Sequence, residues 1–312
     1  MRVGWARDYG VVLVLAALVV VFSLSTSAFL TTTNLQNLAQ QSGEPGLLAC
    51  GMTAVIIAGE FDLSVGAIFG FAGVIAAIVA NAAGIPAAIA AGVAVGAALG
   101  LVNGIVVSRG GLQSFLVTLA TQFVFVGAAI YITHGQDNWR VNDFAGFAGV
   151  ADGTIAGIQH KAWIALAAFV AVGALLSRTR LGRQIFAVGG NAAAARVAGV
   201  RIHAVRVAVF VLSGALAALA GVLAAADTGV AQADGGIGTE FTAITAVIIG
   251  GTSIAGGRGS VWRTLAGVLL LAVIANGFTL LYVSPNYDLL VQGTIILAAI
   301  LADARLRRRA FA

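Results

Sequence analysis

Charge is scarce in this sequence of 312 residues, because only 9% of them are Asp, Glu, Lys or Arg. An average soluble domain carries roughly 25% charged residues. Apolar residues make up 60% of the chain, and the mean hydropathy is +1.02. A membrane-spanning helix takes about 20 such residues, so spanning helices would occupy most of this length. We therefore predict an all-α, polytopic membrane protein without a separate soluble catalytic domain.

Cysteine and lysine are each represented once. The single cysteine, Cys50, excludes an internal disulfide. The single lysine, Lys161, excludes a GxxxxGK[ST] loop of the kind that holds nucleotide phosphates. The three histidines, His134, His160 and His203, are dispersed and lack a cysteine partner. We therefore expect no metal site, no catalytic site and no cofactor bound by this chain.

Apolar runs separated by polar breaks predict about ten spanning helices within one transmembrane domain, residues 1–312. The second and eighth runs are short for a complete crossing, which is typical of broken or tilted segments beside a cavity. The predicted spans are 10–30, 46–59, 64–83, 86–107, 112–132, 162–177, 207–226, 241–255, 264–283 and 288–303.

The basic residues fall on one side of this topology. With a cytoplasmic N-terminus, 15 of the 17 basic residues are cytoplasmic, and only Arg140 and Lys161 lie outside. The positive-inside rule then predicts that both termini are cytoplasmic. The formal charge of +5 is explained in this way without nucleic-acid binding. Residues 178–206 form the longest predicted cytoplasmic loop, and residues 133–160 form an extracytoplasmic loop.

Glycine is frequent, with 41 residues, and it is regularly spaced in the fourth predicted span. A glycine at every fourth position produces a groove along one helix face, into which a second helix can pack closely. We therefore predict a helix-packing role for Gly92, Gly96, Gly100 and Gly104.

A short segment recurs in the two short spans. Residues 53–59 read TAVIIAG and residues 245–251 read TAVIIGG, with six identities in seven. One interpretation is an internal duplication, in which spans one to four correspond to spans seven to ten. The other is a chance match, because the sequence is rich in Ala, Val, Ile and Gly.

Polar side chains interrupt several apolar spans, and two carboxylates separate the second span from the third. Neutral hydrogen-bonding groups suit an uncharged, hydroxyl-rich solute better than an ion. Hydrogen bonding between helices is the alternative interpretation. Asp62 can also cap the following helix by accepting from the N–H of Ser64 or Val65, and Glu60 can pair with a cytoplasmic arginine. The candidates for a translocation pathway are Glu60, Asp62, Asn103, Thr121, Gln122 and Asn276.

The loop at 178–206 has the features of a docking element. A Gly189-Gly190 pair predicts a break in secondary structure. Asn191 is a suitable N-cap for a short Ala-rich helix at 192–198. Arg196 and Arg201 give this segment a basic surface. Attraction to lipid headgroups is one interpretation. We favour docking of a soluble partner, because attraction to lipid would need only a basic surface and not a helix bounded by turn residues.

Four ordered motifs connect the chain to a known family. They are FDLSVG at 61–66, TLAT at 118–121, RTRLGRQIFAVGGN at 178–191 followed by AARVAGV at 194–200, and IGGTSIAGGRGSV at 249–261. Through these motifs the chain resembles the permease subunit of ribose-type ABC sugar importers, in the branched-chain amino acid/ribose permease superfamily. Family members commonly read GGIDLSVG, whereas this chain reads GEFDLSVG, so that Glu60 replaces a glycine.

The resemblance implies a subunit of the bacterial plasma membrane that forms the import pathway for a monosaccharide or related polyol. It further implies a second permease chain as homodimer or heterodimer, an extracytoplasmic solute-binding protein, and a cytoplasmic ATPase with two nucleotide-binding halves that holds ATP and Mg²⁺. Candidates for coupling to the ATPase are Gly189, Gly190, Asn191, Arg196, Gly199 and Arg201.

Two other functions remain open at this point. One is an ABC importer for branched-chain amino acids or nucleosides. The other is an ion-coupled secondary carrier, which would require carboxylates deep within the spans.

Overall fold

The structure, a computed structural model, describes residues 2–136 and 138–284 and positions 287, 290, 291, 293, 294 and 297. Its described part is almost entirely helical. The helices are α1 Arg2–Ser25, α2 Thr32–Gln41, α3 Gly43–Ile57, α4 Val65–Ala83, α5 Ile85–Gly110, α6 Ser114–Ile132, α7 Phe144–Asp152, α8 His160–Arg178, α9 Arg180–Gly190, α10 Ala192–Val197, α11 Ile202–Thr228, α12 Thr239–Ile249 and α13 Val261–Leu280. The short strands are β1 Trp139–Arg140, β2 Thr154–Ile155, β3 Ile158–Gln159 and β4 Val230–Ala231.

Six of these helices, α4, α5, α6, α8, α11 and α13, are long and apolar enough to cross a membrane. Shorter apolar helices occur at Gly10–Ser25, α3 and α12. The prediction of a multi-pass, all-α membrane protein is thereby confirmed, and the two short predicted spans are short helices. The tenth predicted span, 288–303, and the C-terminus lie outside the continuously described residues.

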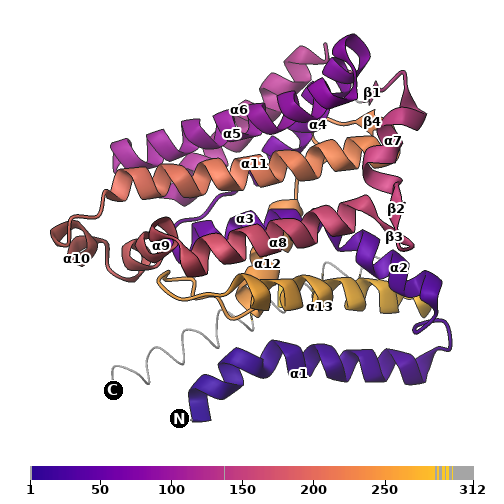
Figure 1. Cartoon of the computed structure of the whole chain (residues 1–312), viewed down its shortest axis with the longest axis horizontal. Coiled ribbons are helices and arrows are strands. Elements are labelled where there is room, and N and C mark those ends of the chain that lie inside the picture. Colours follow the sequence, from indigo (N-terminus) through magenta and orange to yellow (C-terminus); the bar gives the residue numbers. More distant parts are fainter. Residues whose placement is uncertain are drawn as a thin grey trace.

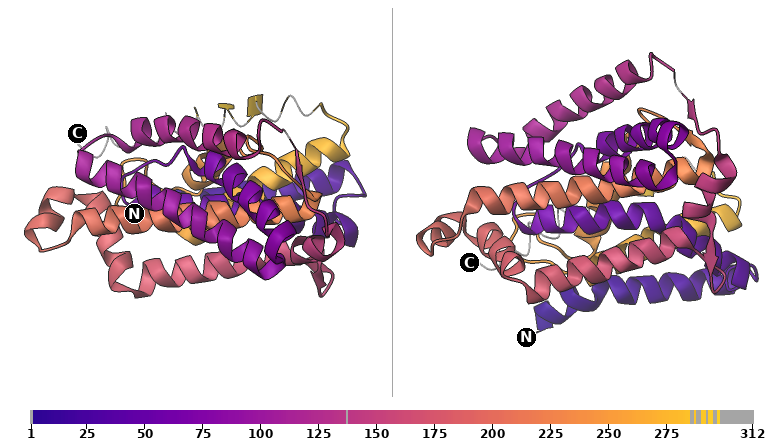
Figure 2. Two further views of the ribbon diagram at one scale, coloured as in Figure 1. Left: turned by 90° about the horizontal axis from the view of Figure 1, so that it is seen from above. Right: turned by 45° about the horizontal axis from the view of Figure 1, so that its top comes forward.

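The long helices lie side by side, roughly along one axis of the molecule (Figure 1). The start of α1, α9 and α10 lie at one end, called here the α10 end, while α7, β1 and β4 lie at the other, called the α7 end. Both views in Figure 2 show α10 projecting beyond the other helices. The predicted loops 178–206 and 133–160 therefore lie at opposite ends of the bundle.

Helix α5 packs against α11 along its glycine-bearing face. A Cβ atom at Gly96 would overlap the Cβ of Ala218, and a Cβ at Gly100 would overlap the carbonyl oxygen of Phe210. Gly92 and Gly104 face α11 in the same way. Because lipid gives helices no hydrophobic reason to associate, close backbone contact of this kind supplies the packing energy.

The repeated heptapeptide has the same backbone structure at both of its positions. Helices α3 and α12 each end next to a glycine with positive φ, 82° at Gly59 and 77° at Gly251. In each case the N–H after this glycine donates to the carbonyl five residues earlier, at 3.1 and 3.2 Å. This is the hydrogen-bond pattern of a glycine C-cap. The wider correspondence of spans one to four with seven to ten stays a prediction.

Several local features differ from the sequence analysis. Gly189 and Gly190 do not break the secondary structure, because they form the last residues of α9, and the break lies at Asn191 with φ −161° and ψ 99°. The sequence analysis did not predict α7, α9 or the short amphipathic helix α2. Its N-cap is Thr31, whose hydroxyl accepts from Asn34 N at 3.3 Å.

Candidate functional site

A cavity of about 720 Å³ lies beside the segment that joins α3 to α4. Its volume is within the range of small-molecule sites, about 300–1,000 Å³. Of the six pathway candidates, Glu60 lines this cavity. The other lining residues come from the α3–α4 segment, the α5–α6 connection, the first turn of α6, the second turn of α11, and α12 with the loop after it. They are Gly59, Phe61, Leu63, Gly111, Leu112, Gln113, Ser114, Phe115, Arg206, Phe241, Ile244, Ile248 and Ile254.

Glu60 forms an ion pair with Arg206, with 2.6 Å between Oε1 and Nε. The sequence analysis expected a cytoplasmic arginine as partner without identifying it. The two side chains are 8% and 28% exposed, so solvent screens this pair less than a surface pair. The cavity thus combines an apolar wall with one electrically neutral pair of charges.

Asp62 belongs to the same α3–α4 segment but does not line the cavity, and it is completely buried. One carboxylate oxygen accepts from Ser64 N at 3.1 Å and from the Ser64 hydroxyl at 2.6 Å. The other accepts from the Ser213 hydroxyl at 3.0 Å. Asn103 donates to Ser64 Oγ at 2.7 Å, while its own Oδ1 is buried without a hydrogen-bond partner. The predicted hydrogen bond from Ser64 N is present, and this network fixes the loop to α5 and α11.

The remaining pathway candidates lie apart from the cavity. Gln122 donates to Glu240 at 3.2 Å, which joins α6 to α12. Asn276 and Asn34 exchange two hydrogen bonds, at 2.9 and 2.8 Å, between α13 and α2. Thr121 donates to the carbonyl of Thr118 in its own helix. The structure therefore does not bring the six candidates together, and their roles in transport stay predictions.

Three glycine-containing segments meet at the end of α3. A Cβ atom at Gly189 would overlap the carbonyl oxygen of Ile57, and the same oxygen accepts from Gly257 N at 2.8 Å. Gly59 lies against Gly189 and Gly256. This junction places the backbone of α9 directly on the segment that leads to Glu60. Glycine is required at position 189 because a side chain has no space there.

Helix α10 presents an exposed tip at the end of the bundle. Asn191 caps it by accepting from Ala194 N at 3.0 Å, as its position in the sequence predicts. Arg196, Gly199 and Arg201 are exposed. Val197 is 92% exposed, a feature that the sequence analysis missed.

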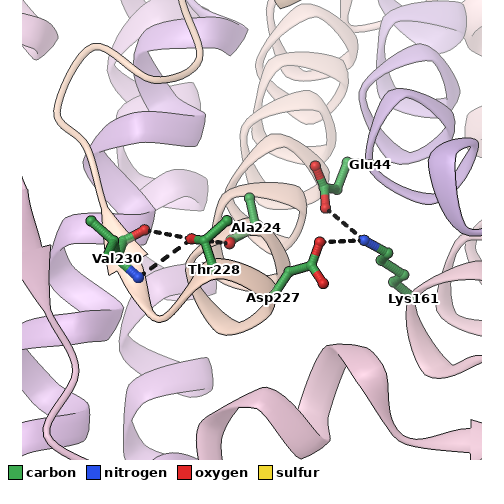
Figure 3. A network of polar contacts seen from close by, with 6 residues as sticks. All are labelled: Glu44, Lys161, Ala224, Asp227, Thr228 and Val230. Atoms are coloured by element: carbon green, nitrogen blue, oxygen red, sulfur yellow. Dashed lines mark hydrogen bonds and ion pairs between the residues drawn. The ribbon is translucent and has the colours of Figure 1, made fainter. Parts of the chain in front are cut away.

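At the α7 end, Lys161 lies between two carboxylates (Figure 3). Its Nζ is 2.6 Å from Asp227 and 3.5 Å from Glu44, and its side chain is 5% exposed. These ion pairs join α8 to α11 and α3, which the sequence did not predict. Burial and the neighbouring Asp227 carboxylate together raise the pKa of Asp152 in α7 to about 6. The cluster therefore gathers more negative than positive charge.

The 133–160 loop is held to the bundle by backbone and amide hydrogen bonds. Strand β1 pairs with β4, with Trp139 opposite Ala231 and Arg140 opposite Val230. Asn81 of α4 donates to the Arg140 carbonyl at 3.0 Å. Asp143 caps α7 through Gly146 N. The loop is therefore a structured surface at the α7 end.

Comparison with known proteins gives a consistent result. A family model described as "Branched-chain amino acid transport system / permease component" matches residues 34–300. The ribose import permease protein RbsC of Bacillus subtilis (strain 168) is 38% identical over 303 residues, which are 97% of this chain and 94% of the relative. RbsC of Escherichia coli (strain K12) is 38% identical over 305 residues, covering 96% and 94% of the two chains.

A relative named for another sugar is similar along almost the same length. The L-arabinose transport system permease protein AraH of Escherichia coli (strain K12) is 35% identical over 298 residues, covering 95% of this chain and 90% of the relative. No solved structure matches the chain.

Proposed function

Because the chain belongs to the branched-chain amino acid transport system/permease component family, we propose that it forms the translocation pathway of an ATP-driven sugar importer. The observation that carries this proposal is the similarity, along nearly the whole chain, to permeases named for ribose and for arabinose. The proposed solute is a monosaccharide or related polyol. The cavity next to Glu60 supports this choice, because its lining combines apolar walls with a few hydrogen-bonding groups.

The α10 end is proposed to face the cytoplasm. The exposed arginines Arg178, Arg180, Arg183, Arg196 and Arg201 all belong to this end. The positive-inside rule favours that placement in the bacterial inner membrane. The α7 end then faces the outside, where Trp139, Arg140 and Asp143 contribute to the proposed surface for a solute-binding protein. Asp137, which was predicted to belong to this surface, lies outside the described residues.

ATP and Mg²⁺ are proposed to bind to a separate cytoplasmic ATPase with two nucleotide-binding halves. The segment 178–206 is proposed to receive its movement, through α10 with Asn191, Arg196, Gly199 and Arg201. A second permease chain completes the assembly in the lipid bilayer. The exposed Val197 supports docking of a protein, because attraction to lipid headgroups alone needs only the cations.

Uptake of labelled D-ribose and L-arabinose tests the function. The permease is reconstituted in proteoliposomes with its ATPase and binding protein, and ATP is enclosed on the cytoplasmic side. We expect saturable uptake that stops when ATP is omitted. Uptake of labelled valine or uridine, with no uptake of the labelled sugars, would favour the amino acid or nucleoside alternative. Uptake that follows an ion gradient without ATP would favour a secondary carrier.

The double variant Arg196→Glu/Arg201→Glu tests the docking surface. Reversing two exposed charges at the tip should weaken association with the ATPase by about tenfold or more, since like charges brought together oppose binding. Copurification of the two subunits measures this effect. Arg140→Glu, an exposed substitution at the α7 end, is the matched control and should copurify normally. Equal recovery of the ATPase with both variants would contradict the assignment.

A further inference from the structure

Another cavity, of about 260 Å³, lies on the flank of the bundle between α8 and α13. These two helices lie side by side, and α2 lies near both of them at the α7 end (Figure 1). The cavity is called here the flank groove. The residues that define it are Gly43, Ala162, Trp163, Leu166, Leu265 and Leu269.

The lining of the flank groove has little capacity for hydrogen bonding. Of its described lining residues, only Ser42 and Trp163 have a polar group in the side chain. The Ser42 hydroxyl donates to the carbonyl of Leu38 at 2.7 Å, and the Trp163 indole N–H donates to the carbonyl of Ile155 at 3.1 Å. Both donors are thus used within the chain. A sugar would leave its hydroxyl groups without partners here, whereas a hydrocarbon loses nothing.

The flank groove opens on a face of α8 that is directed away from the protein. Trp163, Leu166 and Val170 are spaced three and four residues apart, and they are 37%, 40% and 52% exposed. This spacing places them on one face of the helix. Because α8 is long and apolar enough to cross a membrane, this face contacts lipid. The mouth of the groove, which includes Trp163 and Leu166, therefore opens toward hydrocarbon.

The direction of the flank groove matches that of a lipid chain. Trp163 lies in the first turn of α8, and its indole is bonded to strand β2 at the α7 end. Tryptophan is enriched where the membrane meets water, so this residue indicates the level of the headgroups. Phe169, which also lines the groove, lies about 9 Å further along α8 at 1.5 Å per residue. The groove therefore extends from the interface into the acyl-chain region.

Small residues create the space in the flank groove. Gly43 begins α3, and Ala162 and Ala165 face it from α8, so no large side chain joins α8 to α13 at this level. An apolar cavity of about 150 Å³ is enough to bind benzene, and the flank groove is larger. A hydrocarbon chain in the groove contacts both helices and adds dispersion attraction that they do not supply to each other.

We propose that the flank groove binds one acyl chain of a phospholipid from the membrane leaflet at the α7 end. The chain lies along α8 against Leu265 and Leu269 of α13, and its headgroup stays at the level of Trp163. This lipid site is separate from the cavity next to Glu60 and takes a ligand of opposite chemistry. It is also independent of which solute the permease carries.

The variant Ala162→Leu provides the first test, because it places a larger apolar side chain in the groove. The full-length permease is purified, incubated with dioleoyl phosphatidylglycerol and analysed by native mass spectrometry. Retention of the most tightly bound phospholipid should fall by about tenfold, since losing contact with about two methylene groups is enough for that factor. Ala167→Leu, an exposed substitution on α8 outside the groove, is the matched control and should retain the lipid. Equal retention by the two variants would overturn the proposal.

Photolabelling of the unmodified permease provides the second test and does not depend on a variant that folds. A phosphatidylglycerol with a diazirine in its acyl chain should label α8 around Leu166, and it should also label Phe123 of α6, which is 72% exposed. Excess unlabelled phosphatidylglycerol should remove the label from α6 quickly and from α8 slowly. A parallel loss from both helices would show ordinary contact with bulk lipid and would overturn the site. Absence of label on α8, with crosslinks from α8 to a second permease chain, would overturn it as well.

Discussion

Gly189→Ala is expected to remove most ATP-driven uptake, whereas Gly190→Ala is expected to leave it nearly normal. The two glycines are neighbours in the last turn of α9 but differ in the space around them. A Cβ at Gly189 would overlap the carbonyl of Ile57, while a Cβ at Gly190 would lie 3.9 Å from Gly257 Cα, an ordinary contact. Overpacking of this kind typically destabilises by about 1–3 kcal/mol, which corresponds to roughly 5- to 150-fold in an equilibrium.

The measurement is sugar uptake by the complete importer, normalised to the amount of folded permease. In Gly189→Ala the end of α9 must move away from α3, so the ATPase should still dock while transport falls. Gly190→Ala is the control for a methyl group added to the same turn. Equal uptake by the two variants would show that the contact between Gly189 and Ile57 does not transmit movement.

Gly100→Ala is expected to lower the thermal stability of the purified permease by several degrees. Its Cβ would overlap the carbonyl of Phe210, so α5 would have to move away from α11. Overpacking is again expected to destabilise by about 1–3 kcal/mol, which lowers the melting temperature. The effect is expected in detergent and in lipid, since the overlap is within one chain.

Gly127→Ala is the matched control for that substitution. Gly127 also lies inside an apolar helix, α6, but nothing approaches its Cβ position within 4 Å. An added methyl group there should leave the melting temperature unchanged or raise it slightly, because alanine favours helix over glycine by about 1 kcal/mol. Equal melting temperatures for the two variants would contradict close packing of α5 on α11.

Sequence alone located the long apolar helices, but it missed α2, α7 and α9 and could not pair the polar residues. Asn276 and Gln122 interrupt apolar runs in the same way, so a pattern cannot separate a pathway from an interhelical contact. In the structure Asn276 is hydrogen-bonded to Asn34, and Gln122 is hydrogen-bonded to Glu240. The partners are separated by 242 and 118 residues, a distance over which local patterns contain no information.

The segment around Glu60 shows the same difference between contacts that are local in the sequence and contacts between distant residues. The sequence identified two carboxylates between two spans and predicted that Asp62 accepts from Ser64, because that contact is local. It did not choose among many arginines for Glu60, nor did it predict that Asp62 receives a third hydrogen bond from Ser213, 151 residues away. Only the crossing of α11 beside this segment places Arg206 and Ser213 there.

The sequence by itself determined the membrane class, the approximate helices, the two short spans and the family, because hydropathy and motif order are properties of consecutive residues. The tertiary structure decided that Arg206 is the partner of Glu60, that Lys161 joins Glu44 to Asp227, and that Gly189 rests on Ile57. These contacts depend on how helices distant in sequence cross one another. Their geometry is fixed by side-chain packing and backbone approach, which no local pattern specifies.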